Sequence, residues 1–139
     1  MSNTPRPETS KNKPYWIERH RYYELKHFCL QYPIWKKMRE SIDGMTPRKA
    51  DLAIFCQTGD ISNPTATAAE ARLFYTNRIE MLEHIAKEVD PVIGNYILEA
   101  VTTGMSYDIL NARRSIPCSR ELYYELYRRF FWLLSKERQ

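Results

Sequence analysis

Apolar residues recur at helical spacing along most of the chain, beginning just after Pro14. Proline is favoured in the first turn of a helix, so a helix is predicted to begin at Pro14. Pro33 ends this helix or begins the next one, whose apolar pattern stops at Asp43-Gly44. Turn residues fill the stretch 45–63, and its apolar segment 52–56 fits either one helical turn or a short extended piece.

A long central helix is predicted to begin at Pro64, with Ser62 or Asn63 as its N-terminal cap. Its apolar residues step by four and three positions alternately and form a heptad-like seam of Tyr75, Ile79, Leu82, Ala86 and Val89. The Asp90-Pro91 pair predicts a kink or a new helix capped by Asp90, because proline removes a helical hydrogen bond. The seam sustains fewer than four heptads, which favours packing within one chain over a dimeric coiled coil.

The last third of the chain predicts two helices joined by a tight turn. Gly104 stops the preceding helix, and a short helix follows over about Ser106–Arg114 with its serine as cap. Ile116-Pro117-Cys118 forms the turn, and the last helix covers about Ser119–Lys136, again with a serine cap.

The fold class predicted from these elements is all-α. A disordered tail over 1–13 precedes a single helical domain over 14–139, in which 104–136 form a helix-turn-helix-like pair. The chain has only 4 glycines, which argues against a turn-rich β-sandwich.

Charge is distributed unevenly along the chain. Lys and Arg outnumber Asp and Glu by 11 to 5 over 1–49 and by 7 to 4 over 105–139, whereas 50–104 has 3 against 8. The basic ends either bind phosphates, where lysine and arginine displace condensed counterions, or form solvated faces. Three widely spaced cysteines without CxxC spacing favour reduced thiols in the cytoplasm. No apolar run approaches the ~20 residues of a membrane helix, so no membrane partner is expected.

The turn at Ile116-Pro117 and the helix after it form the strongest functional pattern. In a helix-turn-helix, the second helix directs its first turns into the major groove of DNA. The candidate contacts are Arg113, Arg114, Ser119 and Arg128 for phosphates and Arg120, Tyr123 and Tyr124 for base edges. The alternative interpretation is an ordinary αα-hairpin with a proline turn.

The segment Ser106–Tyr124 resembles the region-4 helix-turn-helix of sigma factors and, more closely, phage transcriptional regulators of the ArpU/RinA type. The residues that carry this resemblance are Ser106-Tyr107-Asp108-Ile109-Leu110, Ile116-Pro117-Cys118-Ser119-Arg120 and Tyr123-Tyr124. The ends of the chain, 15–19 and 127–134, resemble prophage-encoded proteins of low-GC Gram-positive bacteria. The resemblance implies control of late phage genes through double-stranded DNA in the cytoplasm of a bacterial host. Asn111 departs from the pattern, because a small residue is usual there.

The last helix is apolar on nearly all sides, which requires burial or a partner surface. Packing against the N-terminal helix, whose Trp16, Tyr23 and Phe28 need partners, is the favoured interpretation. The alternative is a homodimer or another partner bound through an aromatic surface of Tyr127, Phe131 and Trp132.

Catalytic patterns are weak, and neither an enzyme, a metal site nor a cofactor is expected. Glu24 and His27 form one Glu-x-x-His step, whereas a di-metal helical bundle needs two. The sequence contains no Gly-rich phosphate loop and no GxSxG motif. The rival function is a small helical phage protein that binds and inhibits a host protein, such as a defence nuclease. A virion or packaging accessory protein is the third possibility.

Overall fold

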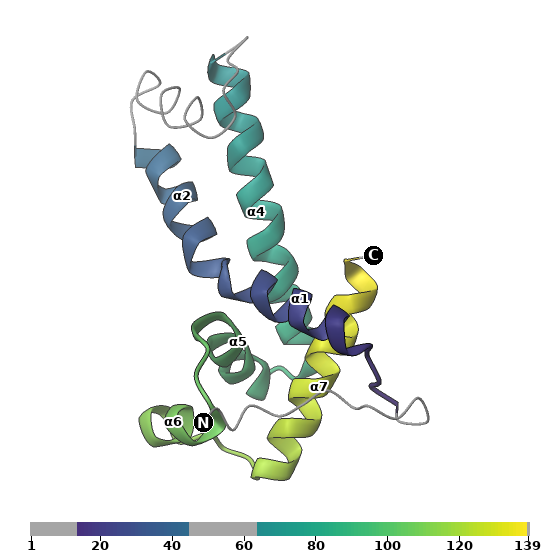
Figure 1. Ribbon diagram of the computed structural model, residues 1–139. Helices are drawn as coiled ribbons and strands as arrows, with labels where there is room; N and C mark the ends of the chain where they lie inside the picture. The colour runs from purple at the N-terminus through teal and green to yellow at the C-terminus, as the bar shows by residue number, and fades with distance from the viewer. Residues whose placement is uncertain (1–13, 45–63, 139) are drawn as a thin grey trace. The chain divides into compact units, whose positions relative to one another are not determined.

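The fold class is all-α, as predicted. The computed structural model describes residues 14–44 and 64–138, and these residues contain helices but no β-strand (Figure 1). The helices are α1 (Arg19–Leu30), α2 (Tyr32–Gly44), α4 (Pro64–Val89), α5 (Ile93–Thr103), α6 (Tyr107–Arg114) and α7 (Arg120–Glu137). The predictions for the tail 1–13, the segment 52–56 and the caps Ser62 and Asn63 lie outside the described residues. Within the described ranges, no helix combines the length and the apolar character needed to cross a membrane.

The chain divides by its internal contacts into two compact units. Unit 1 combines the residues up to Gln31 with those from Leu82 onward, so it holds α1, the end of α4, and α5 to α7. Unit 2 is Tyr32–Met81, which holds α2 and most of α4. Unit 2 is therefore inserted between the first helix of unit 1 and the remainder of that unit.

The first helix begins five residues later than the sequence predicted, at Arg19 rather than at Pro14. The carboxylate of Glu18 accepts hydrogen bonds from the backbone N–H groups of His20 at 2.8 Å and Arg21 at 3.1 Å. Glu18 itself has an extended backbone, so it acts as the N-cap. The prediction at Pro14 was wrong because this glutamate, rather than the proline, satisfies the first free N–H groups.

The long helix ends at Asp90-Pro91, as predicted, and a new helix follows. The Oδ1 atom of Asp90 accepts hydrogen bonds from the N–H groups of Val92 and Ile93, both at 2.8 Å. These two bonds hold the pKa of Asp90 below its usual range, and the bond from Ile93 has the larger effect. The predicted seam is also confirmed, because all its members are buried: Tyr75, Ile79, Leu82, Ala86 and Val89.

The junction between α4 and α5 is packed backbone against backbone. The N–H of Gly94 donates to the carbonyl oxygen of Asp90 at 3.0 Å, and Asp90 donates to that of Ala86 at 3.3 Å. A Cβ atom added at Gly94 would collide with the carbonyl group of Ala86. Only glycine therefore lets the first turn of α5 lie directly on the last turns of α4.

In unit 1, α1, α5 and α7 contact one another, and α6 contacts α5. The hydroxyl groups of Tyr22 on α1 and Tyr127 on α7 form a buried hydrogen bond of 3.0 Å. The ring of Tyr22 also lies edge-on to Phe131, with 5.0 Å between the ring centroids. The favoured interpretation of the aromatic last helix, packing against the N-terminal helix, is confirmed.

Buried tyrosines make unit 1 sensitive to alkali. Burial raises the pKa of Tyr123 and Tyr127, and to a lesser degree that of Tyr22. In the unfolded chain these phenols ionise near pH 10, whereas in the folded core they stay neutral. Their contribution to stability is therefore complete below about pH 10 and is lost as the pH rises above it.

We expect the melting temperature to fall steeply between about pH 10 and 11. Thermal unfolding followed by circular dichroism at a series of pH values checks this. The Tyr127→Phe variant should lose less stability over that range, although its hydrogen bond with Tyr22 is absent at every pH. A wild-type melting temperature that does not change up to pH 11 would contradict the prediction.

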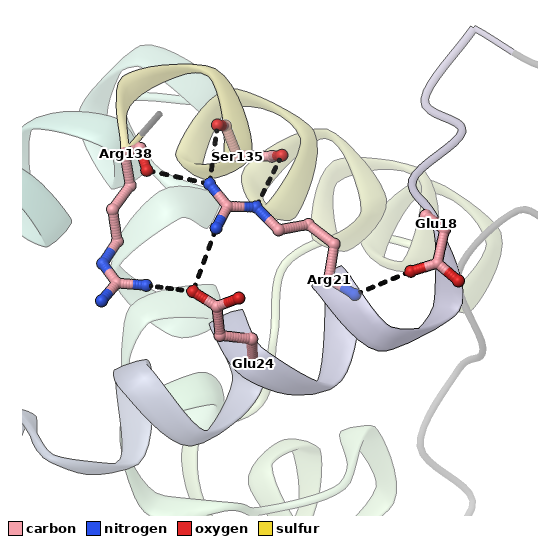
Figure 2. Close-up of polar contacts among 5 residues, drawn as sticks. All are labelled: Glu18, Arg21, Glu24, Ser135 and Arg138. Carbon is pink, nitrogen blue, oxygen red and sulfur yellow. Dashed lines mark hydrogen bonds and ion pairs between the residues drawn. The ribbon is translucent and has the colours of Figure 1, made fainter.

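A group of polar side chains fixes the C-terminal end of α7 against α1. We call Arg21, Glu24, Ser135 and Arg138 the Arg21 cluster (Figure 2). The guanidinium of Arg21 donates to the backbone oxygens of Ser135 at 3.1 Å and Arg138 at 2.9 Å, and to Ser135 Oγ at 3.3 Å. Glu24 accepts from Arg21 at 3.0 Å and from Arg138 at 2.8 Å. Arg21 therefore supplies hydrogen bonds to carbonyl groups in the last turn of α7, where the helix leaves them unpaired.

Unit 2 pairs α2 with the first part of α4. The Nε atom of Arg72 on α4 lies 2.7 Å from Oδ1 of Asp43 on α2. Each helix contributes buried aromatic residues, among them Trp35 and Tyr75. Among the residues of this unit that the structure describes, three large apolar side chains are exposed, namely Ile34, Leu73 and Phe74.

Candidate nucleic-acid interface

Helices α6 and α7 have the predicted starting points. The Oγ atom of Ser106 accepts a hydrogen bond from the N–H of Ile109 at 3.4 Å, and that of Ser119 accepts from Leu122 at 3.2 Å. Both serines have extended backbones and cap their helices, as predicted. Gly104 ends α5 with φ of 77°, in the left-handed region that suits glycine.

The turn between α6 and α7 is held from both sides. Ser115 ends α6 in the left-handed region with φ of 54°. The Oδ1 atom of Asn111 accepts a hydrogen bond of 2.9 Å from the N–H of Ile116, whose side chain is buried. The N–H of Cys118 donates to the Ile116 oxygen at 2.9 Å. The amide of Asn111 thus helps to fix the turn.

Helix α7 has two distinct faces. Its inner face lies in the core of unit 1 and comprises Tyr123, Leu126, Tyr127, Phe130, Phe131 and Leu134. The first turn is exposed at Ser119, Arg120 and Glu121. The helix is therefore anchored along its length while its N-terminal turn faces solvent.

The two adjacent tyrosines of α7 have different surroundings. Tyr123 is only 1 % exposed, and its ring centroid lies 4.9 Å from that of Tyr107 on α6. The expectation that Tyr123 reaches a base edge is corrected, because a ring in the core has no surface to offer. Tyr124 is half-buried at the edge of the same aromatic group, 5.9 Å from Tyr107, so part of its ring remains accessible.

Arg120 is half-exposed at the start of α7. Its guanidinium forms an ion pair with the carboxylate of Asp108 on α6. It also lies over the ring of Tyr107, 5.0 Å from the centroid. Two contacts from α6 therefore set the direction of this side chain.

The arginines proposed for phosphate contacts lie in different settings. Arg113 and Arg114 are exposed at the end of α6, and Arg114 forms an ion pair of 3.1 Å with Glu99 on α5. Arg128 is half-buried on α7. The structure thus places Arg113 and Arg114 directly before the turn between α6 and α7, and Arg128 in the middle of α7.

The aromatic surface proposed for a partner is mostly internal. Tyr127 and Phe131 are buried in the core of unit 1, so the expectation that they form an external interface is corrected. Trp132 is half-buried, packs edge-on to Tyr15 at 5.6 Å and carries Lys136 over its ring at 3.5 Å. Tyr15 packs on Trp132, and Tyr22 contacts Tyr127 and Phe131. These contacts cover the rings, so α7 has no broad exposed aromatic patch.

Two exposed carboxylates lie on the outer face of α7. Glu121 and Glu125 follow each other at i and i+4, and Arg128 continues the same outer face at i+7. Because a helix repeats every 3.6 residues or about that, positions 121, 125 and 128 share one side of α7, and Tyr123 points to another side. This spacing identifies the outer face. A carboxylate in a major groove accepts a hydrogen bond from a cytosine amino group but repels phosphates, so these turns suit base edges better than the backbone.

Among residues 14–44 and 64–138, no three His, Cys, Asp or Glu side chains converge in a way that holds a metal ion. Burial, and to a lesser degree the charge of Asp90, raise the pKa of the Cys118 thiol, which makes it a poor nucleophile. Comparison with models of protein families, with curated proteins and with solved structures finds no match to this chain.

Proposed function

We propose that this protein binds double-stranded DNA through α6 and α7, with the first turns of α7 in the major groove. One observation carries the proposal: α7 is anchored in the core of unit 1, yet its capped first turn is exposed at Arg120 and Glu121. A helix held in this way offers side chains to base edges without the entropy cost of ordering a loop.

The charges around α7 agree with a duplex as the partner. Arg113 and Arg114 at the end of α6 lie beside the turn, where a backbone phosphate would pass a helix in the groove. The ion pair between the exposed Arg114 and the half-buried Glu99 lies at the surface, where such pairs contribute little to stability. Arg114 therefore exchanges this partner for a phosphate at small cost.

The regulatory role rests on the resemblance of Ser106–Tyr124 to ArpU/RinA-type regulators. Such a protein would occupy a site upstream of late phage genes and change their transcription. Selection of bound duplexes from a random library, followed by a reporter with the selected site, tests this role. A selected sequence that leaves transcription unchanged would restrict the function to DNA binding.

Charge reversal at the turn tests the DNA interface directly. Because each lost phosphate contact reduces counterion release, Arg113→Glu and Arg114→Glu should each weaken binding to all duplexes about tenfold at low salt. The slope of log affinity against log salt should flatten by about one unit per lost contact. Fluorescence anisotropy with a labelled pool of random duplexes measures both quantities.

The matched control is Lys87→Glu, which makes the same charge change at an exposed position of α4 within unit 1. It should alter affinity by less than about twofold, because only the long-range field changes. Equal losses in all three variants would show a general charge effect and remove Arg113 and Arg114 from the interface. Absence of binding by the wild-type protein at micromolar concentration would overturn the proposed function.

A protein-binding module is the second candidate, favoured by the exposed apolar side chains of unit 2. Ile34, Leu73 and Phe74 are exposed on α2 and α4, and Arg78 lies over the Phe74 ring at 3.4 Å. Exposed apolar groups of this kind occur at protein interfaces. This candidate predicts a host protein as the partner, with no retardation of DNA. A second copy of the chain on this surface would appear as a dimer on a sizing column.

A further inference from the structure

Arg120 is half-exposed at the start of α7 and makes two contacts with a neighbouring helix. Its guanidinium meets the carboxylate of Asp108 on one side and lies over the ring of Tyr107 on the other. Both partners belong to the first turn of α6. A flexible side chain has therefore been given one preferred direction by a neighbouring helix.

The aromatic partner is itself immobilised. Tyr107 is buried, and its hydroxyl donates to the backbone oxygen of Cys118 at 3.4 Å. Its ring centroid lies 4.9 Å from that of Tyr123, which is in the core. The surface under Arg120 is thus a fixed part of unit 1, so the direction of the guanidinium follows the direction of α7.

Stability does not account for the ion pair between Arg120 and Asp108. The two side chains are 50 % and 51 % exposed, and pairs this open to water contribute little to folding. A guanidinium has five N–H donors, of which one carboxylate uses at most two. Half of the Arg120 side chain is exposed, so N–H donors that Asp108 does not use can reach solvent or a ligand.

We propose that Asp108 is a positioning residue that aims Arg120 at a guanine in the major groove. Arginine recognises guanine by donating two parallel hydrogen bonds to O6 and N7, which requires a fixed plane of the guanidinium. The carboxylate of Asp108 supplies that plane from the side opposite the base. This inference rests on the proposed function and adds the identity of one base that the protein selects.

The experiment is selection of duplexes from a random library by wild-type protein, Asp108→Asn and Arg120→Lys. The wild type should require guanine at one position of its site. In Asp108→Asn, the enrichment of guanine over the other bases at that position should fall about fivefold to tenfold. The base preferences at the other positions should be unchanged. Arg120→Lys keeps the charge and can still pair with Asp108 but lacks the planar fork, so it should lose the same preference. Circular dichroism of each variant verifies that it is folded.

The matched control is Glu99→Gln, which neutralises the carboxylate that pairs with Arg114. Because this carboxylate does not contact Arg120, the guanine preference should be retained. An unchanged preference in Asp108→Asn or in Arg120→Lys, while the wild type selects a site, would overturn this inference and leave DNA binding intact. A wild-type protein that selects no duplex would overturn the proposed function itself.

Discussion

Replacing Gly94 with alanine is expected to lower the free energy of unfolding by about 3 kcal/mol or more. The added Cβ would collide with the backbone carbonyl group of Ala86, and a Cβ atom has no rotation by which it could avoid this contact. A side chain can rotate away from a clash, whereas here α4 and α5 themselves must separate. The separation would also lengthen the hydrogen bond from Gly94 to the Asp90 oxygen, now 3.0 Å. Urea unfolding followed by circular dichroism measures the loss.

Gly44 provides the matched control, because it is also a helical glycine. A Cβ atom added there meets no atom of the described chain within 4 Å. Gly44→Ala should therefore leave stability unchanged or raise it by up to about 1 kcal/mol, since alanine restricts the unfolded chain. Similar stabilities for Gly94→Ala and Gly44→Ala would show that the junction of α4 and α5 relaxes easily, contrary to our expectation.

Replacing Arg21 with alanine is expected to lower the free energy of unfolding by about 2 to 3 kcal/mol. The guanidinium makes hydrogen bonds to Ser135 and Arg138 in the last turn of α7 and to Glu24 on its own helix (Figure 2). Without Arg21, the backbone carbonyl groups of Ser135 and Arg138 lose their hydrogen bonds within the protein, and the C-terminal end of α7 is no longer tied to α1. The side chain is 25 % exposed, so water replaces only part of the lost interaction.

Two variants separate this role from a general effect of charge. Arg19→Ala removes an exposed arginine of the same helix whose described contact is the Tyr23 ring at 5.8 Å, and it should cost less than about 0.5 kcal/mol. Arg21→Lys keeps the charge but not the fork, so it should recover only part of the stability. Hydrogen exchange of the last turn of α7 should accelerate in Arg21→Ala. Full recovery by lysine would show that charge alone matters.

The sequence was sufficient to predict those elements whose signals are local. Ser106 and Ser119 were recognised as caps, and Asp90-Pro91 as the point where the long helix ends and a new one follows, because such signals depend on a few neighbouring residues. The buried seam of α4 followed from its period. The start of α1 was missed because glutamate is a less frequent cap than serine, so Pro14 carried the stronger local signal.

Features that depend on contacts between distant residues were beyond the reach of the sequence. The burial of Tyr123 and the partial burial of its neighbour Tyr124 both involve contact with the ring of Tyr107, which lies on a different helix. The pairing of Arg120 on α7 with Asp108 on α6 likewise depends on the direction in which the turn sends α7, which the sequence does not specify. The requirement for glycine at position 94 arises from the approach of two helix ends, which no local pattern encodes.

The insertion of unit 2 has a consequence during synthesis of the chain on the ribosome. Tyr22 and its partner Tyr127 are 105 residues apart in sequence. At about 5 to 20 residues per second, roughly 5 to 20 s pass between their appearance, and α1 has no α7 to cover it in that interval. A helix whose apolar face, with Tyr22, Leu25 and Phe28, stays uncovered this long is a natural substrate for nascent-chain chaperones. The α2–α4 pair of unit 2 can form while the remainder is still being made.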